Sequence, residues 1–369
     1  MTIDGISPGR VIKIGTIEQA AEIIRTEKGS IVPMGGGTQM EFGNPLRSAD
    51  CLLDLSGLCR ITAYNPAELT IHVEAGVKLK EVHRLLEENN QTLPLDPWNG
   101  PDATIGGIAA ANAQGPLRAT GTIRDWIIGM KVVHADGRIS KTGGRVVKNV
   151  TGYDLAKLYT GSLGTLAVIA EISFKVRPRV GKTATAIAEF EGLDEAHAAV
   201  SKIRGSPLQP VCCELVGPRH AVWVRFEEHP KAIAGQIAQL PPAEWKTLEG
   251  GEEIAAWKKL RDHYLAMGPV VIRAVGLPSE IGGMIETHQP SSWIAHAMNG
   301  IVLMALPDAG HISRVRERRS AVIEKAPMDV RRAVPTFAVQ GAARRLMEDM
   351  KQSFDPGRRL NPGRHIDGE

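Results

Sequence analysis

The feature that most constrains the fold is a dense set of glycines between Pro101 and Phe174, set among strand-like apolar runs. Glycine tolerates a positive φ and lets the backbone approach a ligand without an intervening Cβ. The stretch contains Pro-Asp-Ala-Thr-Ile-Gly-Gly at 101–107, Gly-Thr-Ile-Arg-Asp at 121–125, Lys-Asn-Val-Thr-Gly-Tyr-Asp-Leu at 148–155 and Gly-Ser-Leu-Gly-Thr-Leu at 161–166. Such backbone is typical of sites that hold a pyrophosphate, so the stretch predicts a nucleotide cofactor.

A second glycine loop, Gly35-Gly36-Gly37-Thr38-Gln39, follows a strand predicted at 31–34. Successive N–H groups in such a loop can form a nest for an anion, although a plain turn between strands fits these residues equally well. No Gly-Lys-Ser or Gly-Lys-Thr follows the loop directly, as a Walker pattern requires. Residues 41–45, Glu-Phe-Gly-Asn-Pro, would interrupt a helix here, so a nicotinamide-binding Rossmann domain is also disfavoured.

The length of 369 residues allows two packed domains. The net charge of only +3 gives no basic field of the kind that attracts nucleic acid. The four cysteines, Cys51, Cys59, Cys212 and Cys213, form no Cys-x-x-Cys pair, so we expect buried thiols, no iron–sulfur cluster and no metal site. The N-terminus lacks the features of a signal peptide and no apolar run approaches membrane-spanning length, so we expect a cytoplasmic protein.

Beyond Arg179 the glycine density falls and a different pattern of elements begins. We expect strands at 183–190, 211–216 and 221–226, with helices at 194–203 and 232–240. This order predicts a split βαβ unit of the ferredoxin-like type. A helix at 254–265, strands at 270–275 and 301–305 and a final helix at 344–354 are expected to follow.

The glycine segments occur together with a tail motif, Phe354-Asp355-Pro356 and Leu360-Asn361-Pro362-Gly363-Arg364. In this order the motifs resemble those of the vanillyl-alcohol oxidase family, which carries a PCMH-type FAD-binding domain. Within that family they are most similar to the FAD-binding subunits of bacterial glycolate oxidases. The resemblance implies an α+β fold with a PCMH-type FAD-binding domain of two α/β subdomains (1–180), a ferredoxin-like α+β cap (181–335) and a C-terminal segment (336–369) that returns to the first domain.

The resemblance also implies which residues hold the cofactor. They come from the two glycine segments, from the last strand of the first domain and from the tail: Gly35, Gly36, Gly37, Thr38, Gln39, Pro101, Thr104, Gly106, Gly107, Gly115, Gly121, Asp125, Gly164, Val168, Ile169 and Asn361. Asn361 is equally compatible with a simple turn before proline. Neither glycine segment contains the His or Cys that attaches flavin covalently in relatives, so we expect noncovalent FAD, with attachment through a cap histidine left open.

Catalytic residues are not evident in the sequence. Catalytic members of the wider family carry a His-rich, metal-binding segment in the cap, whereas residues 293–300 here keep one histidine, His296, with no carboxylate beside it. A structural role for His296 is therefore favoured over a catalytic one. Arg225, Arg261 and Arg273 could each meet a substrate carboxylate, or could equally pair with an internal acid.

The resemblance implies the FAD-binding subunit of a complex that oxidises glycolate or a related small 2-hydroxy acid to the 2-oxo acid. It implies as partners a larger FAD-containing catalytic subunit and an iron–sulfur subunit, with any contact to the membrane made through them. Two alternatives stay open: a stand-alone FAD-dependent oxidoreductase acting on a 2-hydroxy acid or alcohol, and an assembly subunit that keeps the fold without FAD.

Overall fold

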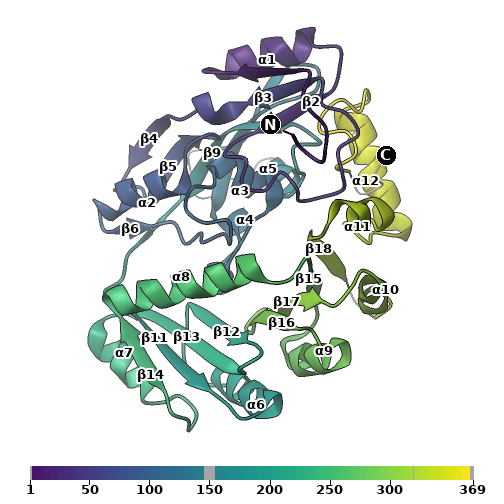
Figure 1. Ribbon diagram of the computed structural model, residues 1–369. Helices are drawn as coiled ribbons and strands as arrows, with labels where there is room; N and C mark the ends of the chain where they lie inside the picture. Colours follow the sequence, from purple (N-terminus) through teal and green to yellow (C-terminus); the bar gives the residue numbers. More distant parts are fainter. Residues whose placement is uncertain (1, 145–153, 319, 366–369) are drawn as a thin grey trace. The chain divides into compact units, whose positions relative to one another are not determined.

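A computed structural model describes residues 2–144, 154–318 and 320–365 (Figure 1). Contacts group the chain into two compact units. The first comprises Met1–Gly115, Gly121–Arg179 and Arg331–Glu369, and the second comprises Pro116–Thr120 and Val180–Val330. The boundaries expected from the sequence, near residues 180 and 335, remain our proposal for the domain division. The α+β class predicted from the sequence is confirmed.

The first unit begins with a small α/β subdomain built on a parallel sheet of order β1-β3-β2. Its elements are β1 (Arg10–Lys13), α1 (Ile17–Thr26), β2 (Ile31–Met34) and β3 (Cys51–Asp54). Thr16 caps α1 by accepting the N–H of Gln19 at 3.2 Å, which satisfies one of the unpaired donors of the first turn. Ile17, Ala20, Ala21 and Ile24 recur at helical spacing and are buried, so this face attaches α1 to the sheet.

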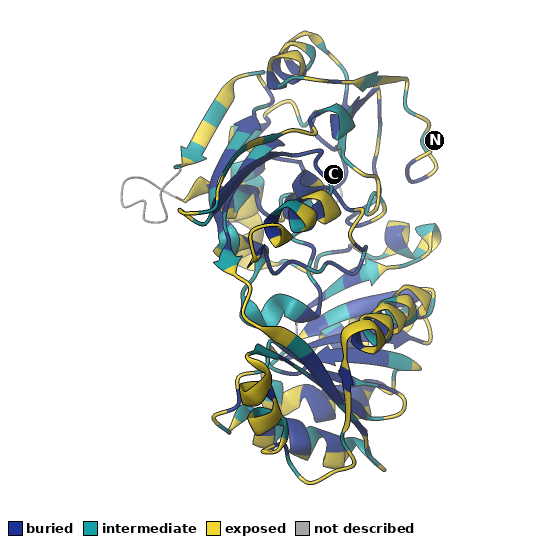
Figure 2. Cartoon of the chain, turned by 90° about the vertical axis from the view of Figure 1, so that its left-hand side faces the viewer, coloured by how far each residue is buried: buried dark blue, intermediate teal, exposed yellow. Residues whose placement is uncertain are grey.

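The second subdomain contains a five-stranded antiparallel sheet of order β4-β5-β9-β7-β8. Its strands are β4 (Ile61–Asn65), β5 (Thr70–Glu74), β7 (Ile127–Val133), β8 (Ile139–Gly143) and β9 (Val168–Lys175), and its helices are α2 (Leu79–Glu87), α3 (Ile105–Ala111), α4 (Ile123–Trp126) and α5 (Leu155–Tyr159). The short strands β6 (Gln91–Thr92) and β10 (Arg177–Pro178) pair with each other. Six of the eight residues of the central strand β9 are buried, and its five apolar residues contribute to the cores of both subdomains, whose buried positions are dark blue in Figure 2.

The C-terminal residues belong to this first unit. After α11 (Met328–Ala333) and α12 (Gly341–Phe354) the tail runs beside β2, where the N–H of Ile31 donates to Arg359 O at 2.8 Å and the N–H of Asn361 donates to Ile31 O at 2.9 Å. The tail thereby extends the edge of the parallel sheet, directly before the first glycine loop.

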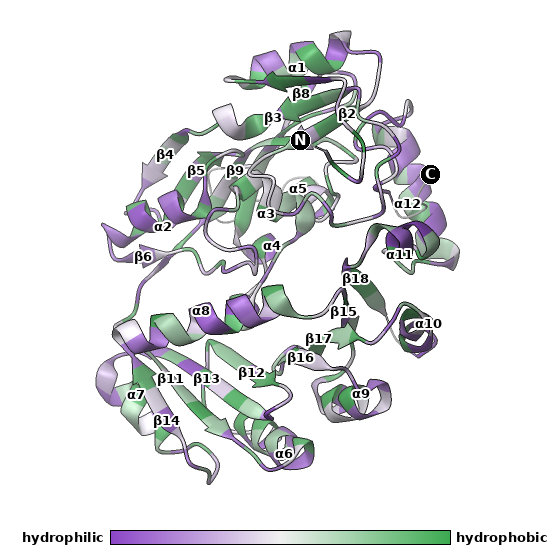
Figure 3. Cartoon of the chain, in the orientation of Figure 1, coloured by the Kyte–Doolittle hydropathy of each residue, from purple (hydrophilic) through white to green (hydrophobic). Residues whose placement is uncertain are grey.

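The second unit is a cap with one eight-stranded antiparallel sheet of order β14-β11-β13-β12-β16-β17-β15-β18. Its elements are β11 (Lys182–Glu189), α6 (Leu193–Arg204), β12 (Cys212–Val216), β13 (Ala221–Glu228), α7 (Pro230–Ile237), β14 (Lys246–Glu249), α8 (Gly250–Ala266), β15 (Val270–Val275), α9 (Ile281–His288), β16 (Ser292–His296), β17 (Ile301–Leu306), α10 (Gly310–Arg316) and β18 (Ala321–Lys325). Apolar residues follow its strands, whereas α8 alternates polar and apolar positions (Figure 3).

The cap consists of two ferredoxin-like halves, where the sequence predicted one. Each half follows the order βαββαβ, and the two join where β12 pairs with β16, with Leu215 opposite Ala295. The expectation of a ferredoxin-like unit is thus confirmed, and the cap contains two of them. The tripeptide Gly181-Lys182-Thr183 leads into β11, an edge-proximal strand of this sheet, and has no Walker-type context.

Candidate functional site

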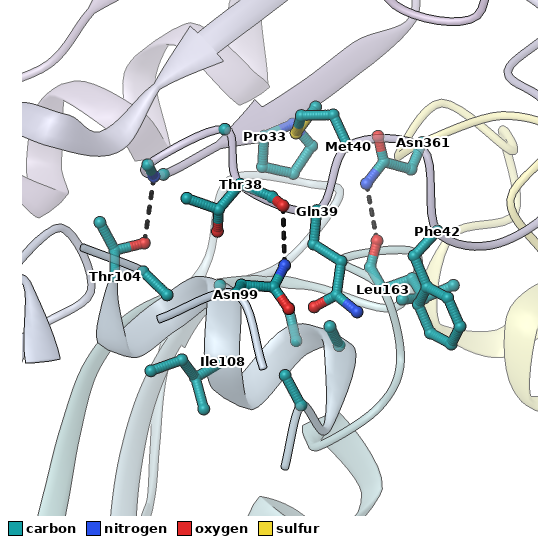
Figure 4. Close-up of a pocket in the computed structure, with 18 of the residues that line it drawn as sticks. Pro33, Thr38, Gln39, Met40, Phe42, Asn99, Thr104, Ile108, Leu163 and Asn361 are labelled. Carbon is teal, nitrogen blue, oxygen red and sulfur yellow. Dashed lines mark hydrogen bonds between the residues drawn. The ribbon is translucent and has the colours of Figure 1, made fainter. Parts of the chain in front are cut away.

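One pocket of the first unit brings together segments that lie far apart in the sequence (Figure 4). It is formed by the first glycine loop, by α3 with the residues before it, by the loop after α5 and by the tail. Its lining residues are Pro33, Gly35, Gly36, Gly37, Thr38, Gln39, Met40, Phe42, Asn99, Ala103, Thr104, Gly107, Ile108, Ala110, Ala111, Ala113, Leu163, Asn361 and Arg364.

The glycine loop is held against the start of α3 by Thr104. The N–H of Gly36 donates to Thr104 Oγ1 at 3.2 Å, and Asn99 donates its side-chain amide to Thr38 O at 2.7 Å (Figure 4). A Cβ added to Gly35 would lie 2.2 Å from Thr104 Oγ1, and Gly37 has a φ of +70°. The loop therefore depends on glycine both for its close approach to Thr104 and for its backbone conformation.

The start of α3 contributes less to the pocket than the sequence predicted. The N–H groups of Ile105 and Gly106 donate to Val77 O and Ala75 O at 2.9 and 2.8 Å, so neither is left for a ligand. A Cβ on Gly106 would lie 2.6 Å from Ala75 Cβ, which explains this glycine by helix–strand packing. Of the first turn, Gly107 is the residue that lines the pocket.

The tail presents an unsatisfied acceptor at the pocket. Asn361 adopts a φ of +46° and donates its side-chain N–H to Leu163 O at 2.6 Å, which fixes the direction of the amide. The other end of the amide, Oδ1, is buried and has no hydrogen-bond partner among the described residues. A buried acceptor without a partner costs free energy, and a ligand that brings an N–H or O–H donor would remove that cost.

The candidates predicted from the sequence divide into two groups. Those that line the pocket are Gly35, Gly36, Gly37, Thr38, Gln39, Thr104, Gly107 and Asn361. Those placed outside its lining are Pro101, Gly106, Gly115, Gly121, Asp125, Gly164, Val168 and Ile169. The segment 148–153 lies outside the described residues. For all of them a role in cofactor binding remains a prediction.

Several candidates outside the lining have a structural explanation. A Cβ on Gly115 would lie 2.0 Å from Asp96 O, so glycine lets two chain segments cross there. The Asp125 carboxylate accepts the N–H of Thr122 at 2.7 Å, and this bond caps α4 and lowers the pKa of Asp125. Val168 and Ile169 are buried in β9 and pack into the core.

Sequence reasoning missed pocket residues that lie in irregular segments, among them Met40, Asn99, Leu163 and Arg364. Arg364 belongs to the tail motif, so its position was a signal that could have been used. Leu163 lies within the glycine segment at 161–166, which was a second signal, whereas Met40 and Asn99 carry no pattern that distinguishes them from ordinary loop residues.

The pocket residues fit FAD. The three glycines at 35–37 expose backbone without side chains in the way, which suits a diphosphate, and the Asn361 oxygen suits a donor on a polar ring. Nonpolar side chains of Ile108, Ala111 and Leu163 complete a surface against which an aromatic ring could pack.

Three pairs of ionisable groups lie within the cap. His296 Nδ1 lies 2.8 Å from Glu214 Oε2, Arg225 Nε lies 3.0 Å from Glu253 Oε1, and Arg273 Nε donates to Glu324 Oε1 at 2.5 Å. Arg225 and Arg273 therefore pair with internal acids, which was one of the two possibilities left open by the sequence. The carboxylate beside His296 escaped the sequence analysis because it comes from a strand 82 positions earlier. Among the described residues no group of three His, Cys, Asp or Glu could hold a metal ion.

Burial lowers the pKa of four histidines, and this predicts acid sensitivity. They are His83, His134, His263 and His296, the last of which lies fully inside the cap near Arg118 and Arg273. Below pH ~6.5 the unfolded chain binds protons that the folded chain does not, so the free energy of unfolding falls as the pH drops. We expect the melting temperature to decrease from pH 7.5 to 5.5, with a smaller decrease for His296→Gln. A melting temperature that is constant over this range would contradict the prediction.

No helix in the described part of the chain has the length and apolar character needed to span a membrane.

Comparison with known proteins adds independent information. A family model described as an FAD binding domain matches residues 8–143. The chain is 30% identical over 363 residues to the glycolate oxidase subunit GlcE of Escherichia coli K12, covering 94% of this chain and 95% of that protein. This similarity extends through the cap and the tail.

Other relatives match over the first half of the chain. The glycolate oxidase subunit GlcD of Bacillus subtilis 168 is 35% identical over 188 residues, 50% of this chain and 40% of that protein. The mitochondrial D-lactate dehydrogenase [cytochrome] of Arabidopsis thaliana is 35% identical over 183 residues, 48% of this chain and 32% of that protein. A solved alkyldihydroxyacetonephosphate synthase matches with a TM-score of 0.67 at 15% identity, covering 95% of this chain and 76% of that one, which concerns the fold alone.

Proposed function

The chain belongs to the family of FAD-binding oxidoreductase subunits that includes the glycolate oxidase subunit GlcE, and we propose that it is the FAD-binding subunit of a glycolate oxidase complex. The observation that carries the proposal is the similarity over 94% of the chain, which includes the cap as well as the FAD-binding domain. The substrate would be glycolate or a related 2-hydroxy acid, oxidised to the 2-oxo acid.

The residues of this chain would hold and orient the cofactor. When bound, FAD would supply the acceptor for the two electrons removed from the substrate. Gly35 and Gly107 would offer backbone to the diphosphate, and Asn361 Oδ1 would accept a hydrogen bond from the cofactor. With neither His nor Cys among the described lining residues, we propose noncovalent FAD.

We propose that a partner performs the substrate step. His296 and Glu214 are almost completely buried, and the carboxylates of Glu253 and Glu324 occupy the guanidinium groups that could bind a substrate carboxylate. The expected partners are a larger FAD-containing catalytic subunit and an iron–sulfur subunit, through which the complex would contact the membrane. The second candidate, a stand-alone oxidoreductase, would need one of these pairs to open for the substrate.

The visible absorption spectrum of the purified chain tests the proposal. We expect the bands of oxidised flavin, and we expect these bands to persist when glycolate or D-lactate is added without oxygen. Bleaching by the chain alone would identify the stand-alone enzyme. If no flavin bands form after incubation with excess FAD, the flavin function fails.

Asn361 allows a specific test of the pocket. Replacing it by glycine removes the amide yet suits the φ of +46°, so the backbone is retained. Loss of a hydrogen bond of about 0.5–1.5 kcal/mol predicts an FAD dissociation constant raised about 2- to 12-fold. Flavin fluorescence titration measures it, and an unchanged dissociation constant would argue against the assigned contact.

A further inference from the structure

A buried carboxylate near the N-terminus binds two arginines from the C-terminal segment of the first unit. Asp4 Oδ1 lies 2.7 Å from Arg331 Nη1, and Asp4 Oδ2 lies 2.8 Å from Arg364 Nη2. The N–H of Leu46 donates to the same Oδ2 at 2.9 Å. The side chain of Asp4 is fully buried, and those of both arginines are 4% exposed. We call Asp4, Arg331 and Arg364 the N-terminal clasp.

The clasp holds the segment that continues the glycine loop. Arg331 donates to Gly43 O at 3.0 Å, and Arg364 donates to Asn44 O at 2.7 Å and to Met40 O. Each guanidinium thus bridges the Asp4 carboxylate to the backbone of residues 40–44. Because Met40, Phe42 and Arg364 line the pocket, this segment forms part of its wall.

The N-terminal turn around Asp4 is shaped for this contact. Ile3 and Ile6 exchange two backbone hydrogen bonds of 2.9 Å, and Asp4 at the tip has a φ of +54°. Ile3 is buried in a small core with Val32, Leu46 and Leu52. The turn is therefore held in place both by apolar packing in this core and by the charged contacts of the clasp.

Within the clasp two guanidinium groups share one carboxylate, and the exposed carboxylate of Glu41 also interacts electrostatically with Arg364. Burial lowers the pKa of Arg364 to about 10, so this group still carries its charge at neutral pH. The backbone carbonyls of residues 40–44 accept hydrogen bonds from both guanidinium groups, so the buried positive charge is stabilised through this segment of the pocket wall. Arg364 lies at the pocket wall, where FAD supplies phosphate and carbonyl oxygens.

We propose that Asp4 is a positioning residue for FAD, which acts through Arg331 and Arg364 to close the wall of the pocket. Docking of the N-terminal turn and binding of FAD are then linked, so each strengthens the other by the same factor. The inference rests on the proposed flavin function for the identity of the ligand. The contacts of the clasp are independent of it.

The first measurement is FAD affinity of the full chain and of Asp4→Asn, by flavin fluorescence titration. Asparagine keeps the shape and removes the charge that orders the two arginines, so we expect a dissociation constant raised at least tenfold. Glu22→Gln is the matched control, because it removes an acid from an exposed pair with Arg25 elsewhere in the same unit. Its dissociation constant should equal that of the unmodified chain.

The second measurement begins with the unmodified chain, and this first part does not depend on how the variant folds. Amide hydrogen exchange at residues 3–6 and 40–46 should slow when FAD is added, and this protection should be lost in Asp4→Asn. The proposal is overturned if FAD leaves exchange at residues 3–6 unchanged. It is also overturned if Asp4→Asn binds FAD as tightly as the control while melting at a lower temperature, because the clasp is then structural only.

These outcomes distinguish a failure of the proposed role of the clasp from a failure of the proposed flavin function. If the unmodified chain binds FAD and the Asp4 variant binds it equally well, the clasp fails and the flavin function stands. If the unmodified chain binds no FAD, the proposed function fails and the clasp with it.

Discussion

Replacing Gly35 by alanine is expected to lower the affinity for FAD by about 10- to 100-fold, which corresponds to about 1.4–2.7 kcal/mol. The added Cβ would lie 2.2 Å from Thr104 Oγ1 and 3.3 Å from Thr104 Cβ. Threonine cannot yield easily, because its own Cβ is close to the added atom and rotation about χ1 breaks the bond that its hydroxyl accepts from Gly36. The loop must therefore move, and with it the backbone that would face the diphosphate.

Two further variants isolate the cause. Gly192→Ala is the control, since no atom lies within 4 Å of its added Cβ and its φ is not positive, so FAD affinity should be unchanged. Thr104→Ala in combination with Gly35→Ala should restore part of the affinity, because the clash is removed. If the losses of binding free energy in Gly35→Ala and Thr104→Ala simply add in the double variant, the clash with Thr104 is not the cause of the weaker binding.

The parts of the fold that could be predicted are the helices and strands whose formation depends on residues within the element itself. The strand β2 and the helix α6 follow from residues within one element, and both were expected. In the cap, the strands β14, β16 and β18 were missed because each gains its stability from pairing with a distant neighbour. The doubling of the ferredoxin-like unit depends on the β12–β16 pairing, which no local pattern records.

The same distinction applies to the candidate site. The glycine loop could be predicted because a missing Cβ is visible in the sequence, whereas Asn361 was predicted only through the resemblance of the tail motif to the family. The contacts of Asp4 could not be predicted, because they join residues 327 positions apart and an aspartate near the N-terminus carries no pattern of its own. Gly106 shows the opposite error, since a glycine required for packing against Ala75 looks the same in sequence as one required for a ligand.

The position of Asn361 depends on a second buried group, Lys351 on α12. Its Nζ donates to Thr165 O at 2.8 Å, to Leu360 O at 3.1 Å and to Asp355 Oδ2 at 2.7 Å, and the Lys351 side chain is 3% exposed. Asp355 also accepts the N–H of Leu360 at 2.8 Å. One ammonium group therefore fixes both the tail and the loop after α5, the two segments that Asn361 joins through Leu163.

Lys351→Met should consequently destabilise the chain by about 3–5 kcal/mol, because the Asp355 carboxylate is left buried without its cation. Urea unfolding followed by circular dichroism measures this loss. The double variant Lys351→Met with Asp355→Asn should recover part of the lost stability, since no charge of this pair then remains buried. As a control, replacing Arg84 in its exposed pair with Glu88 should lower the stability by less than about 1 kcal/mol. FAD affinity should also fall in Lys351→Met, because the segments around Asn361 lose their common anchor. A variant as stable as the unmodified chain would mean that Lys351 does not hold the tail in place.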